Sequence, residues 1–481
     1  MKIFQGKSNW KFILIFGLGI LLRVYNLGKY SIWLDESFAW FIVRNPLSTF
    51  FQALTVSFMH PPLFYLAAKV FVSLFGMSEL SLRLASVLFS VATIWVFMKL
   101  GENTGGDTGK FIGGIFGAFH PMIVWYSQDA WPYSIFLFLS SFSLLIFLKL
   151  QKSPKDNKLW GGLLLVNSLG LLTHYYFMVF VITQSVFVFR EFYRNPNFFR
   201  RWILQILLAM VPLGLWLWVL YSTKDIYIGI GWIQTPSLKD IPLTLWNLVS
   251  GYGGKASWVT TLFGTIALIL ILFGITDKQN KGQNLLYLLG GIFLPIAGAW
   301  VMSLRKPIYI DRYLIFTLPY VVLLVSHGVE KITSEFSQFF REKDYRQIFA
   351  IFLIVVGFLA GLGIHTNPIY ARENWKGLTA FMKNHSVPDE TLFISDELLL
   401  LPLGFYFNEP NSIELLPSEN NCRPTCWWIL RQPYTPPHAF TQSLSTPGRN
   451  FLPNIPSNCS LSEKWESPTG IQAWHLTCSS N

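Results

Sequence analysis

Two adjacent acids, Asp35 and Glu36, are the first residues of this chain whose type and position suggest chemistry. They stand in the stretch SIWLDESFAW (31–40), directly after the first long apolar run. Acidic side chains are costly at the edge of a membrane and are often functional there. The structural alternative is that Asp35 caps a helix that begins at Glu36, with both acids favoured by the helix dipole. The two roles are compatible, so both acids are candidate catalytic residues.

Further polar residues occur in segments that we expect on the same side of the membrane. They are His60 in MHPPLFY; Gln128, Asp129 and Tyr133 in WYSQDAWPYS; His174 in LTHYYF; and Arg305, Lys306, Asp311, Arg312 and Tyr313 in LRKPIYIDRYLIF. Each has a simpler explanation when taken alone. An interfacial histidine often only makes hydrogen bonds, and Arg312 or Lys306 could snorkel to the interface. An arginine that enters an apolar span also suits a phosphate, because its planar fork matches that anion.

Taken together, these residues suit the transfer of a group from a phosphate-linked lipid. A carboxylate would take a proton from an acceptor hydroxyl, and cations would hold the phosphate leaving group. Other chemistries lack their motifs. GGDTGKF does not have the frame of a P-loop, and the chain contains no G-x-S-x-G or H-E-x-x-H sequence.

The composition is that of a membrane protein. Of the 481 residues, 52% are hydrophobic and 13% are charged, whereas a soluble domain carries about 25% charged residues. The net charge of +11 comes from Lys and Arg in short loops between apolar runs. That distribution is typical of membrane topology, so membrane lipids are expected partners and nucleic acid is not.

Apolar runs of about 16 to 20 residues are long enough to cross a hydrocarbon core of ~30 Å. They predict spans near 11–27, 80–100, 111–127, 133–150, 159–174, 176–190, 202–221, 257–276, 284–303, 313–330 and 347–365. The stretch 159–190 is ambiguous, because it could form two short helices with His174 at the turn. The predicted fold is a polytopic α-helical membrane protein with about eleven transmembrane helices.

The basic residues predict the orientation of the chain. With Lys2, Lys7 and Lys11 in the cytoplasm, the inner segments hold 19 Lys and Arg residues, against 11 in or near the outer loops that precede the C-terminal region. The first span lacks a convincing cleavage site and is read as a retained anchor. The predicted topology is multi-pass, with the N-terminus in the cytoplasm and the C-terminal part on the outer side.

The outer parts are predicted to include the loop 28–79, the loop 221–256 and a C-terminal region. Within the first loop, ESFAWFIVRNPLSTFFQAL and PPLFYLAAKVFVSLFG read as amphipathic interfacial helices, with Pro61 and Pro62 starting the second. We divide the chain into a membrane domain, 1–365, and a small extracytoplasmic α/β domain, 366–481. In the latter, WKGLTAFMKNH predicts a helix, TLFIS and CWWIL predict strands, and SEKWESPTGIQAWHLTC predicts a hairpin.

All four cysteines lie in this C-terminal domain: Cys422, Cys426, Cys459 and Cys478. An even number in one polar region indicates disulfides in an oxidising compartment. The alternative is a zinc site, although the spacing matches zinc templates poorly. Three disulfide pairings are open, and pairing of neighbours, Cys422 with Cys426 and Cys459 with Cys478, is our working choice.

The order of the motifs resembles the GT-C membrane glycosyltransferases. The resemblance rests on the acid pair after the first span, HPPL, ELSLRLASVLFS, YSQDAWPYS and RYLIFTLP. It is greatest to the family 39-like branch, the bacterial relatives of protein O-mannosyltransferases and of the aminoarabinose transferases that act on lipid A. It covers roughly residues 10–395, and the cysteine-containing region is less typical.

The resemblance implies a polyprenyl-phosphate sugar donor, an acceptor on the outer face and inversion at the anomeric carbon. Only the resemblance implies that the membrane is a bacterial inner membrane and that its outer side faces the periplasm. It implies that Asp35 is the general base, with Glu36 shaping its environment or touching the acceptor. His60 lies beside the segment that relatives use near the donor phosphate. Arg312, with Tyr313, matches the basic residue near that phosphate, while Arg305 and Lys306 are further candidates for it.

The second outer loop, the short turn near 128–132, departs from the pattern of the relatives. Many bacterial relatives read SQEAR-x-Y where this chain reads SQDAWPY, so Asp129 replaces Glu and Trp131 replaces Arg. Asp129 matches an acid that helps to position the catalytic groups or a divalent ion, but no cofactor is assigned. Arg312 or Arg83 would have to supply the missing phosphate contact.

The predicted function is therefore that of an integral membrane glycosyltransferase that moves a sugar from a polyprenyl-phosphate donor to a lipid, glycan or protein acceptor. His174, Gln128 and Tyr133 are predicted to support the site. The main alternative is a lipid or polyprenyl-phosphate transporter without covalent chemistry. A transporter is expected to carry broken helices and polar residues near the midplane, often with internal symmetry. A receptor or assembly protein acting through its cysteine domain is a third reading.

Overall fold

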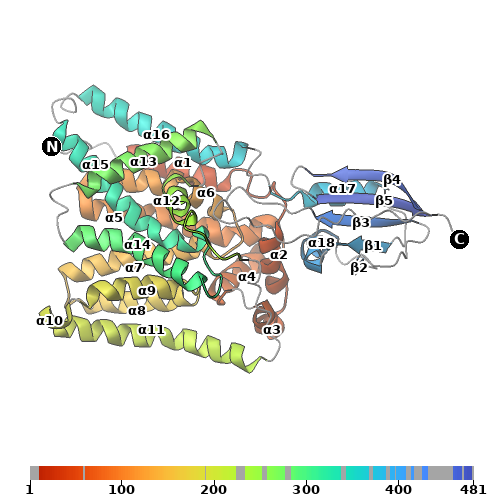
Figure 1. The fold of residues 1–481 in the computed structure, drawn as a ribbon, viewed down its shortest axis with the longest axis horizontal. Coiled ribbons are helices and arrows are strands. Elements are labelled where there is room, and N and C mark those ends of the chain that lie inside the picture. Colours follow the sequence, from red (N-terminus) through yellow and green to blue (C-terminus); the bar gives the residue numbers. More distant parts are fainter. Residues whose placement is uncertain are drawn as a thin grey trace.

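The structure is a computed structural model of the chain. It describes residues 10–57, 60–189, 191–223, 233–251, 257–276, 283–336, 343–367, 372–385, 391–395, 397–407, 413–415, 425–431, 459–467 and 471–478. A bundle of helices forms one part of the molecule, and a smaller domain with a β-sheet projects from one end of it (Figure 1).

The bundle consists of helices that run along the long axis of the molecule, together with short connecting elements. In chain order they are α1 (Trp10–Val24), α5 (Glu79–Phe119), α6 (Pro121–Ser127), α7 (Tyr133–Lys152), α8 (Asn157–Leu171), α9 (Phe177–Val188), α10 (Glu191–Arg194), α11 (Pro196–Ser222), α12 (Asp240–Ser250), α13 (Trp258–Ile275), α14 (Gln283–Ser303), the 3₁₀ helix η2 (Asp311–Thr317), α15 (Leu318–Glu335) and α16 (Lys343–Thr366).

Seven helices in the described ranges are long and apolar enough to cross a membrane. This confirms the predicted class of a polytopic α-helical membrane protein. The predicted spans fall on helical segments. α5 supplies two of them because its backbone is non-helical at Gly105 and Gly106. The predicted span 111–127 continues past the end of α5 into α6, and the span 313–330 begins in η2. The ambiguous stretch 159–190 forms two short helices, α8 and α9, with His174 between them. The loop 221–256 contains α12, which the sequence analysis missed.

Burial separates inner helices from outer ones. In the span that ends in α15, 83% of the apolar window is buried, against 28% in α11. A helix that is apolar all round and exposed on most of its surface is typical of contact with lipid. α15, α7 and α5 therefore form the interior of the bundle, and α11 lies at its edge (Figure 1).

Three short helices cover the end of the bundle that faces the C-terminal domain: α2 (Leu34–Val43), α3 (Leu47–Ser57) and α4 (Leu63–Phe75). The single helix predicted across α2 and α3 is wrong, because Pro46 separates them. Proline disfavours helical backbone angles at the residue before it, which here is Asn45. The side-chain amide of Asn45 donates a hydrogen bond to the carbonyl of Phe41 at 2.6 Å. The second interfacial helix begins after Pro62, as predicted.

The C-terminal domain is a five-stranded sheet, within the described residues, packed against two helices. The helices are α17 (Trp375–His385) and α18 (Leu400–Phe407), and the strands are β1 (Thr391–Ile394), β2 (Ile413–Leu415), β3 (Thr425–Arg431), β4 (Cys459–Glu466) and β5 (Ile471–Cys478). The strand order is β2-β1-β3-β5-β4, with β1 parallel to β2 and β3 and the other pairs antiparallel. This confirms the predicted α17, β1, β3 and hairpin, whereas α18 and β2 were not predicted.

The described cysteines of this domain, Cys426, Cys459 and Cys478, are disulfide-bonded. Cys459 at the start of β4 is bonded to Cys478 at the end of β5, which confirms that predicted pair. Cys426 is also disulfide-bonded, whereas Cys422 lies outside the described residues. The zinc alternative is therefore wrong for Cys459 and Cys478.

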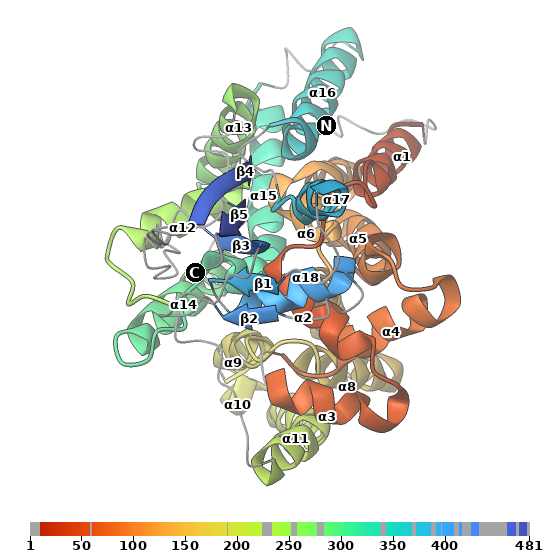
Figure 2. The ribbon, with the colours of Figure 1, turned by 90° about the vertical axis from the view of Figure 1, so that its right-hand side faces the viewer.

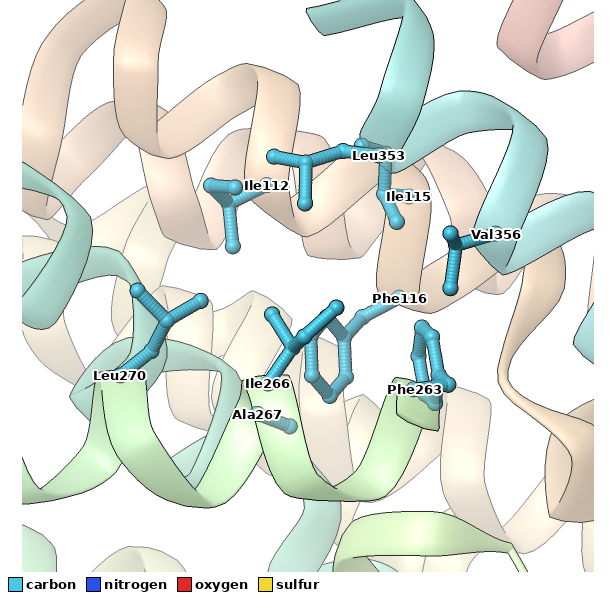
Figure 3. A pocket seen from close by; sticks show the side chains of 9 residues that line it. All are labelled: Ile112, Ile115, Phe116, Phe263, Ile266, Ala267, Leu270, Leu353 and Val356. Carbon is cyan, nitrogen blue, oxygen red and sulfur yellow. The ribbon is translucent and has the colours of Figure 1, made fainter. Parts of the chain in front are cut away.

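A small cavity lies within the membrane bundle, between α5, α13 and α16 (Figure 3). It has a volume of about 20 Å³ and is lined by Ile112, Ile115, Phe116, Phe263, Ile266, Ala267, Leu270, Leu353 and Val356. A space this small with only apolar walls does not hold a polar ligand. This cavity is therefore not the binding site of a polar substrate.

The two halves of α5 pack against each other through glycines. Gly109, Gly113 and Gly117 recur every four residues, and an added Cβ at Gly113 would lie 2.1 Å from the carbonyl oxygen of Phe97. Small residues at this spacing let helix backbones approach closely in membranes. Arg83 lies near the N-terminal end of α5. The close packing of the two halves of α5 therefore helps to fix the position of Arg83.

We expect Gly113→Ala to destabilise the protein by about 1 to 3 kcal/mol, because the new methyl group meets backbone that cannot rotate away. Thermal unfolding of the purified protein in detergent measures the effect. The matched control is Gly161→Ala, whose Cβ would meet no atom within 4 Å. Equal melting of the two variants would contradict the close approach of the two halves of α5.

Candidate active site

The acid pair lies in the first turn of α2, at the end of the bundle that faces the C-terminal domain (Figure 2). The helix begins at Leu34, with Trp33 as its N-cap, so the prediction that Asp35 is the cap is wrong. Instead Glu36 accepts a hydrogen bond from the backbone N–H of Trp33 at 3.3 Å. Successive helical residues point about 100° apart, and the two acids accordingly meet different partners.

The carboxylate of Glu36 is completely buried and lies between two arginines. Arg83 donates to both of its oxygens, at 2.7 and 2.6 Å, and Arg372 donates to Oε2 at 2.8 Å. The backbone N–H of Ala130 donates at 2.9 Å. Burial alone would raise the pKa of Glu36, but Arg83 and Arg372 outweigh it and hold the pKa below its usual range. Glu36 is therefore an ionised structural centre.

Arg83 uses all five of its N–H groups inside the protein. Besides its two bonds to Glu36, it donates to the backbone carbonyls of Leu27, Tyr30 and Ser31 at 2.7 to 3.1 Å. These five hydrogen bonds hold the segment between α1 and α2, and they leave no N–H group of Arg83 for a ligand. Arg83 therefore lies where it can position the loop, and Arg312 is left as the better candidate for the phosphate contact.

Gln128 holds the same region from the second outer loop. Its side-chain amide donates to the backbone carbonyls of Leu22, Arg23 and Tyr25 at 3.3, 3.0 and 2.7 Å. These carbonyls belong to the C-terminal end of α1, where helical acceptors lack internal partners. The amide of Gln128 thus fastens the second outer loop to α1.

Asp129 is completely buried beside Glu36. Its Oδ1 accepts a hydrogen bond from the indole N–H of Trp33 at 2.6 Å, and Arg372 lies 3.9 Å away. Burial first, and the charge of Glu36 second, raise the pKa of Asp129. The two neighbouring acids therefore differ: Glu36 stays ionised, and Asp129 is the group that more readily holds a proton.

Asp35 differs from both buried acids because its side chain is 21% exposed. Its Oδ2 lies 3.3 Å from Nη1 of Arg312, whose side chain is only 6% exposed. Asp311 helps to place Arg312: it accepts from the backbone N–H of Arg312 at 2.7 Å and from the amide of Asn247 at 2.8 Å. The structure thus joins two residues that the sequence analysis named separately.

Aromatic and imidazole rings surround this pair. Arg312 lies over the rings of Tyr133 and Tyr313, at 5.7 and 5.9 Å from their centroids. His60 and His174 face each other with ring centroids 4.7 Å apart, and both contact Tyr133. Burial first, with His174 and Arg312 adding to it, holds the pKa of His60 well below its usual range, so the ring is neutral.

Several polar atoms of these rings are buried without a hydrogen-bond partner in the described part of the chain. They are Nδ1 of His60, Nε2 of His174 and the hydroxyl groups of Tyr65 and Tyr133. Nδ1 of His174 accepts from the backbone N–H of Tyr176 at 3.1 Å, so its Nε2 is the protonated nitrogen. Buried polar groups of this kind normally find a partner. Their concentration beside Arg312 makes them candidate hydrogen-bond partners of a polar ligand.

Two predicted residues do not join this cluster. Arg305 and Lys306 are exposed in the turn after α14. The residue that the sequence analysis missed is Arg372, which follows the last membrane helix and lies against Glu36. Its sequence context, YARENW, does not distinguish it from other basic residues that flank a span. The fold alone reveals its partner.

The acids are a poor fit for a divalent ion. The carboxylate of Glu36 already pairs with the guanidinium groups of Arg83 and Arg372, and that of Asp35 pairs with Arg312. Within the described ranges no group of three or more His, Cys, Asp or Glu side chains is placed to hold a metal. Our mechanism therefore routes no step through a metal ion.

Residues 59–218 match the family model of the dolichyl-phosphate-mannose-protein mannosyltransferases. This match covers less than half of the chain. No curated protein matches it in sequence.

Solved structures resemble nearly the whole chain. ArnT from Cupriavidus metallidurans bound to undecaprenyl phosphate has a TM-score of 0.63 at 12% identity, covering 98% of each chain. Its apo form has a TM-score of 0.60 at 12% identity, covering 87% of this chain and 92% of that one. The Archaeoglobus fulgidus oligosaccharyltransferase tethered with an acceptor peptide has a TM-score of 0.53 at 10% identity, covering 85% and 64%. At these identities the likeness shows the fold alone, and it confirms the predicted GT-C fold.

The two acids of α2 should respond differently to neutralisation. We expect Glu36→Gln to lower the stability by about 3 to 5 kcal/mol, because it leaves two buried guanidinium groups without their counter-charge. We expect Asp35→Asn to lower the stability by less than Glu36→Gln does, because Asp35 is 21% exposed and pairs with one guanidinium group instead of two. Thermal unfolding without substrate tests both. A larger loss for Asp35→Asn would contradict the assignment of Glu36 as the structural acid.

Proposed function

We propose that this chain, whose fold is that of the GT-C membrane glycosyltransferases, transfers a sugar from a polyprenyl-phosphate-linked donor to an acceptor. The observation that carries the proposal is the Asp35–Arg312 pair, in which a partly exposed carboxylate faces a buried guanidinium at 3.3 Å. The partial match to the mannosyltransferase family model and the likeness to ArnT bound to undecaprenyl phosphate support it.

Asp35 is the general base of this proposal. Its carboxylate takes the proton of an acceptor hydroxyl while the oxygen attacks the anomeric carbon of the donor. The bond between that carbon and the phosphate oxygen breaks, the polyprenyl phosphate leaves with the bonding electrons, and the anomeric configuration inverts. The exposure of Asp35 supports this role, because a base has to reach its substrate, and the buried Glu36 does not.

Arg312 binds the phosphate of the donor in this proposal. A guanidinium group stabilises the charge that develops on a phosphate leaving group. The neutral donors beside it, His60, His174 and Tyr133, are placed to offer further N–H and O–H groups. Neutral donors suit a buried phosphate, because they bind the anion without adding more desolvated charge.

The pairing of Asp35 with Arg312 also suggests how the donor prepares the base. In the structure Arg312 compensates the charge of Asp35. A bound phosphate would compete for the same guanidinium, and a carboxylate that loses its cationic neighbour becomes a stronger base. Donor binding would thus activate Asp35 only when the leaving group is in place.

The location of the reaction follows from where the site lies. The acids occupy the end of the bundle that faces the C-terminal domain, and α10 lies at the opposite end (Figure 1). We propose that the acid-bearing end is periplasmic and that the N-terminus is cytoplasmic, in a bacterial inner membrane. The basic loops and the disulfide-bonded domain support this orientation.

The test uses purified protein in lipid nanodiscs with a panel of polyprenyl-phosphate sugars and a membrane extract as acceptor. We expect the wild type to release polyprenyl phosphate from one donor, and Asp35→Asn to reduce the release by about 100-fold or more, as for the loss of a general base. Donor binding should persist in the variant. Asp107→Asn, an acid in the α5 turn, is the matched control.

The outcomes separate the candidate functions. Release that Asp35→Asn leaves unchanged would contradict Asp35 as the base. Saturable donor binding without release from any donor would favour a polyprenyl-phosphate transporter over a transferase.

A further inference from the structure

The segment that follows the last membrane helix returns to the acid centre. Arg372 lies between α16 and α17, and its side chain is only 7% exposed. Its Nη1 donates to Oε2 of Glu36 and its Nη2 donates to the backbone carbonyl of Gln128, both at 2.8 Å. Its guanidinium lies 5.1 Å from the centroid of the Trp125 ring. One side chain thus bridges α2 and the second outer loop.

The C-terminal domain also makes contacts away from Asp35, Glu36 and Asp129. Lys376 at the start of α17 lies 3.0 Å from Glu79 and donates to the carbonyl of Gly28 at 2.8 Å. Tyr406 in α18 donates to Glu79 at 3.0 Å and accepts from the backbone N–H of Ile32 at 2.9 Å. These contacts hold the domain against the segment before α2. They provide a comparison for the role of Arg372.

We propose that Arg372 is a positioning residue for the transfer reaction, which fixes α2 against the second outer loop and so holds Asp35 opposite Arg312. This inference rests on the proposed function, because it assigns Arg372 a part in that reaction. Arg372 donates to Glu36 and to the backbone of Gln128, so it acts on the position of Asp35 through these two neighbours. The bridge needs two donors in fixed directions, which the planar guanidinium supplies and an ammonium does not.

Charge gives Arg372 a second effect at the same place. The buried carboxylates of Glu36 and Asp129 are balanced by Arg83 and Arg372. The charged groups around Asp129 are Glu36 and Asp35 on α2, Arg83 on α5 and Arg372 itself. Without Arg372 the buried centre would hold one cation for two acids, and Asp129 would keep its proton to a higher pH.

The first test compares kcat, KM and donor binding in three variants. For Arg372→Gln we expect kcat to fall by about 100-fold, because small misplacement of a catalytic group has effects of that size, with donor affinity within about twofold. Arg372→Lys keeps the charge and one contact, and should recover part of the loss. Lys376→Gln removes the ion pair with Glu79 and weakens the docking of the same domain without touching Glu36 or Asp129, and should change kcat by less than about twofold.

The second test needs no turnover. Infrared difference spectra recorded against pH follow the protonated carboxyl of Asp129, identified by its loss in Asp129→Asn. Arg372→Gln should raise the pH at which this band disappears, by about one unit, whereas Lys376→Gln should leave it unchanged.

The two tests distinguish failure of this inference from failure of the proposed function. If the wild type transfers no sugar but Arg372→Gln shifts the infrared band, the proposed reaction is wrong. The effect of Arg372 on the buried carboxylates of Glu36 and Asp129 is then still supported. If Arg372→Gln and Lys376→Gln behave alike in both tests, Arg372 only anchors the domain and the inference is overturned. Should Arg372→Gln fail to fold, Arg372→Lys decides: wild-type kcat in that variant would overturn it.

Discussion

The carboxylate of Glu36 is ionised and has no exposed surface, so its burial depends on the two guanidinium groups and two backbone N–H groups that surround it. A buried charge that loses its partner is strongly destabilising. The partners come from the start of α5, the second outer loop and the segment after α16, which lie 47, 94 and 336 residues away along the chain. Their mutual dependence makes this end of the molecule one rigid unit.

This unit explains how two adjacent acids acquire different roles. The carboxylate of Glu36 accepts hydrogen bonds from several segments and holds them together. The side chain of Asp35, one position earlier on the helix, is partly exposed beside Arg312. Asp129 is held next to Glu36 by Trp33, and its burial favours the protonated form. A rigid centre placed next to a partly exposed base is the arrangement that preorganised catalysis requires.

Much of the fold could be predicted from the sequence because hydropathy reports directly on membrane burial. The spans, the interfacial α4 and most of the C-terminal strands follow from pattern and proline positions. The site was predicted only in part. Asp35, Asp129, His60, His174 and Arg312 were named, but periodicity tells which face a residue occupies and not which partner it meets. Arg83 therefore looked like a ligand-binding cation, and Arg372 gave no signal before the fold joined both to Glu36.

Chemical rescue tests the central claim, that Asp35 reacts while Glu36 positions, most directly. Replacing Asp35 by alanine removes the base and leaves space at a site that small molecules can reach, because the native side chain is 21% exposed. Sugar transfer by this variant should therefore recover as formate is added, in proportion to its concentration. Glu36→Ala should show no recovery, because its carboxylate is fully enclosed. Recovery at position 36, or none at position 35 in a folded, donor-binding variant, would contradict the account.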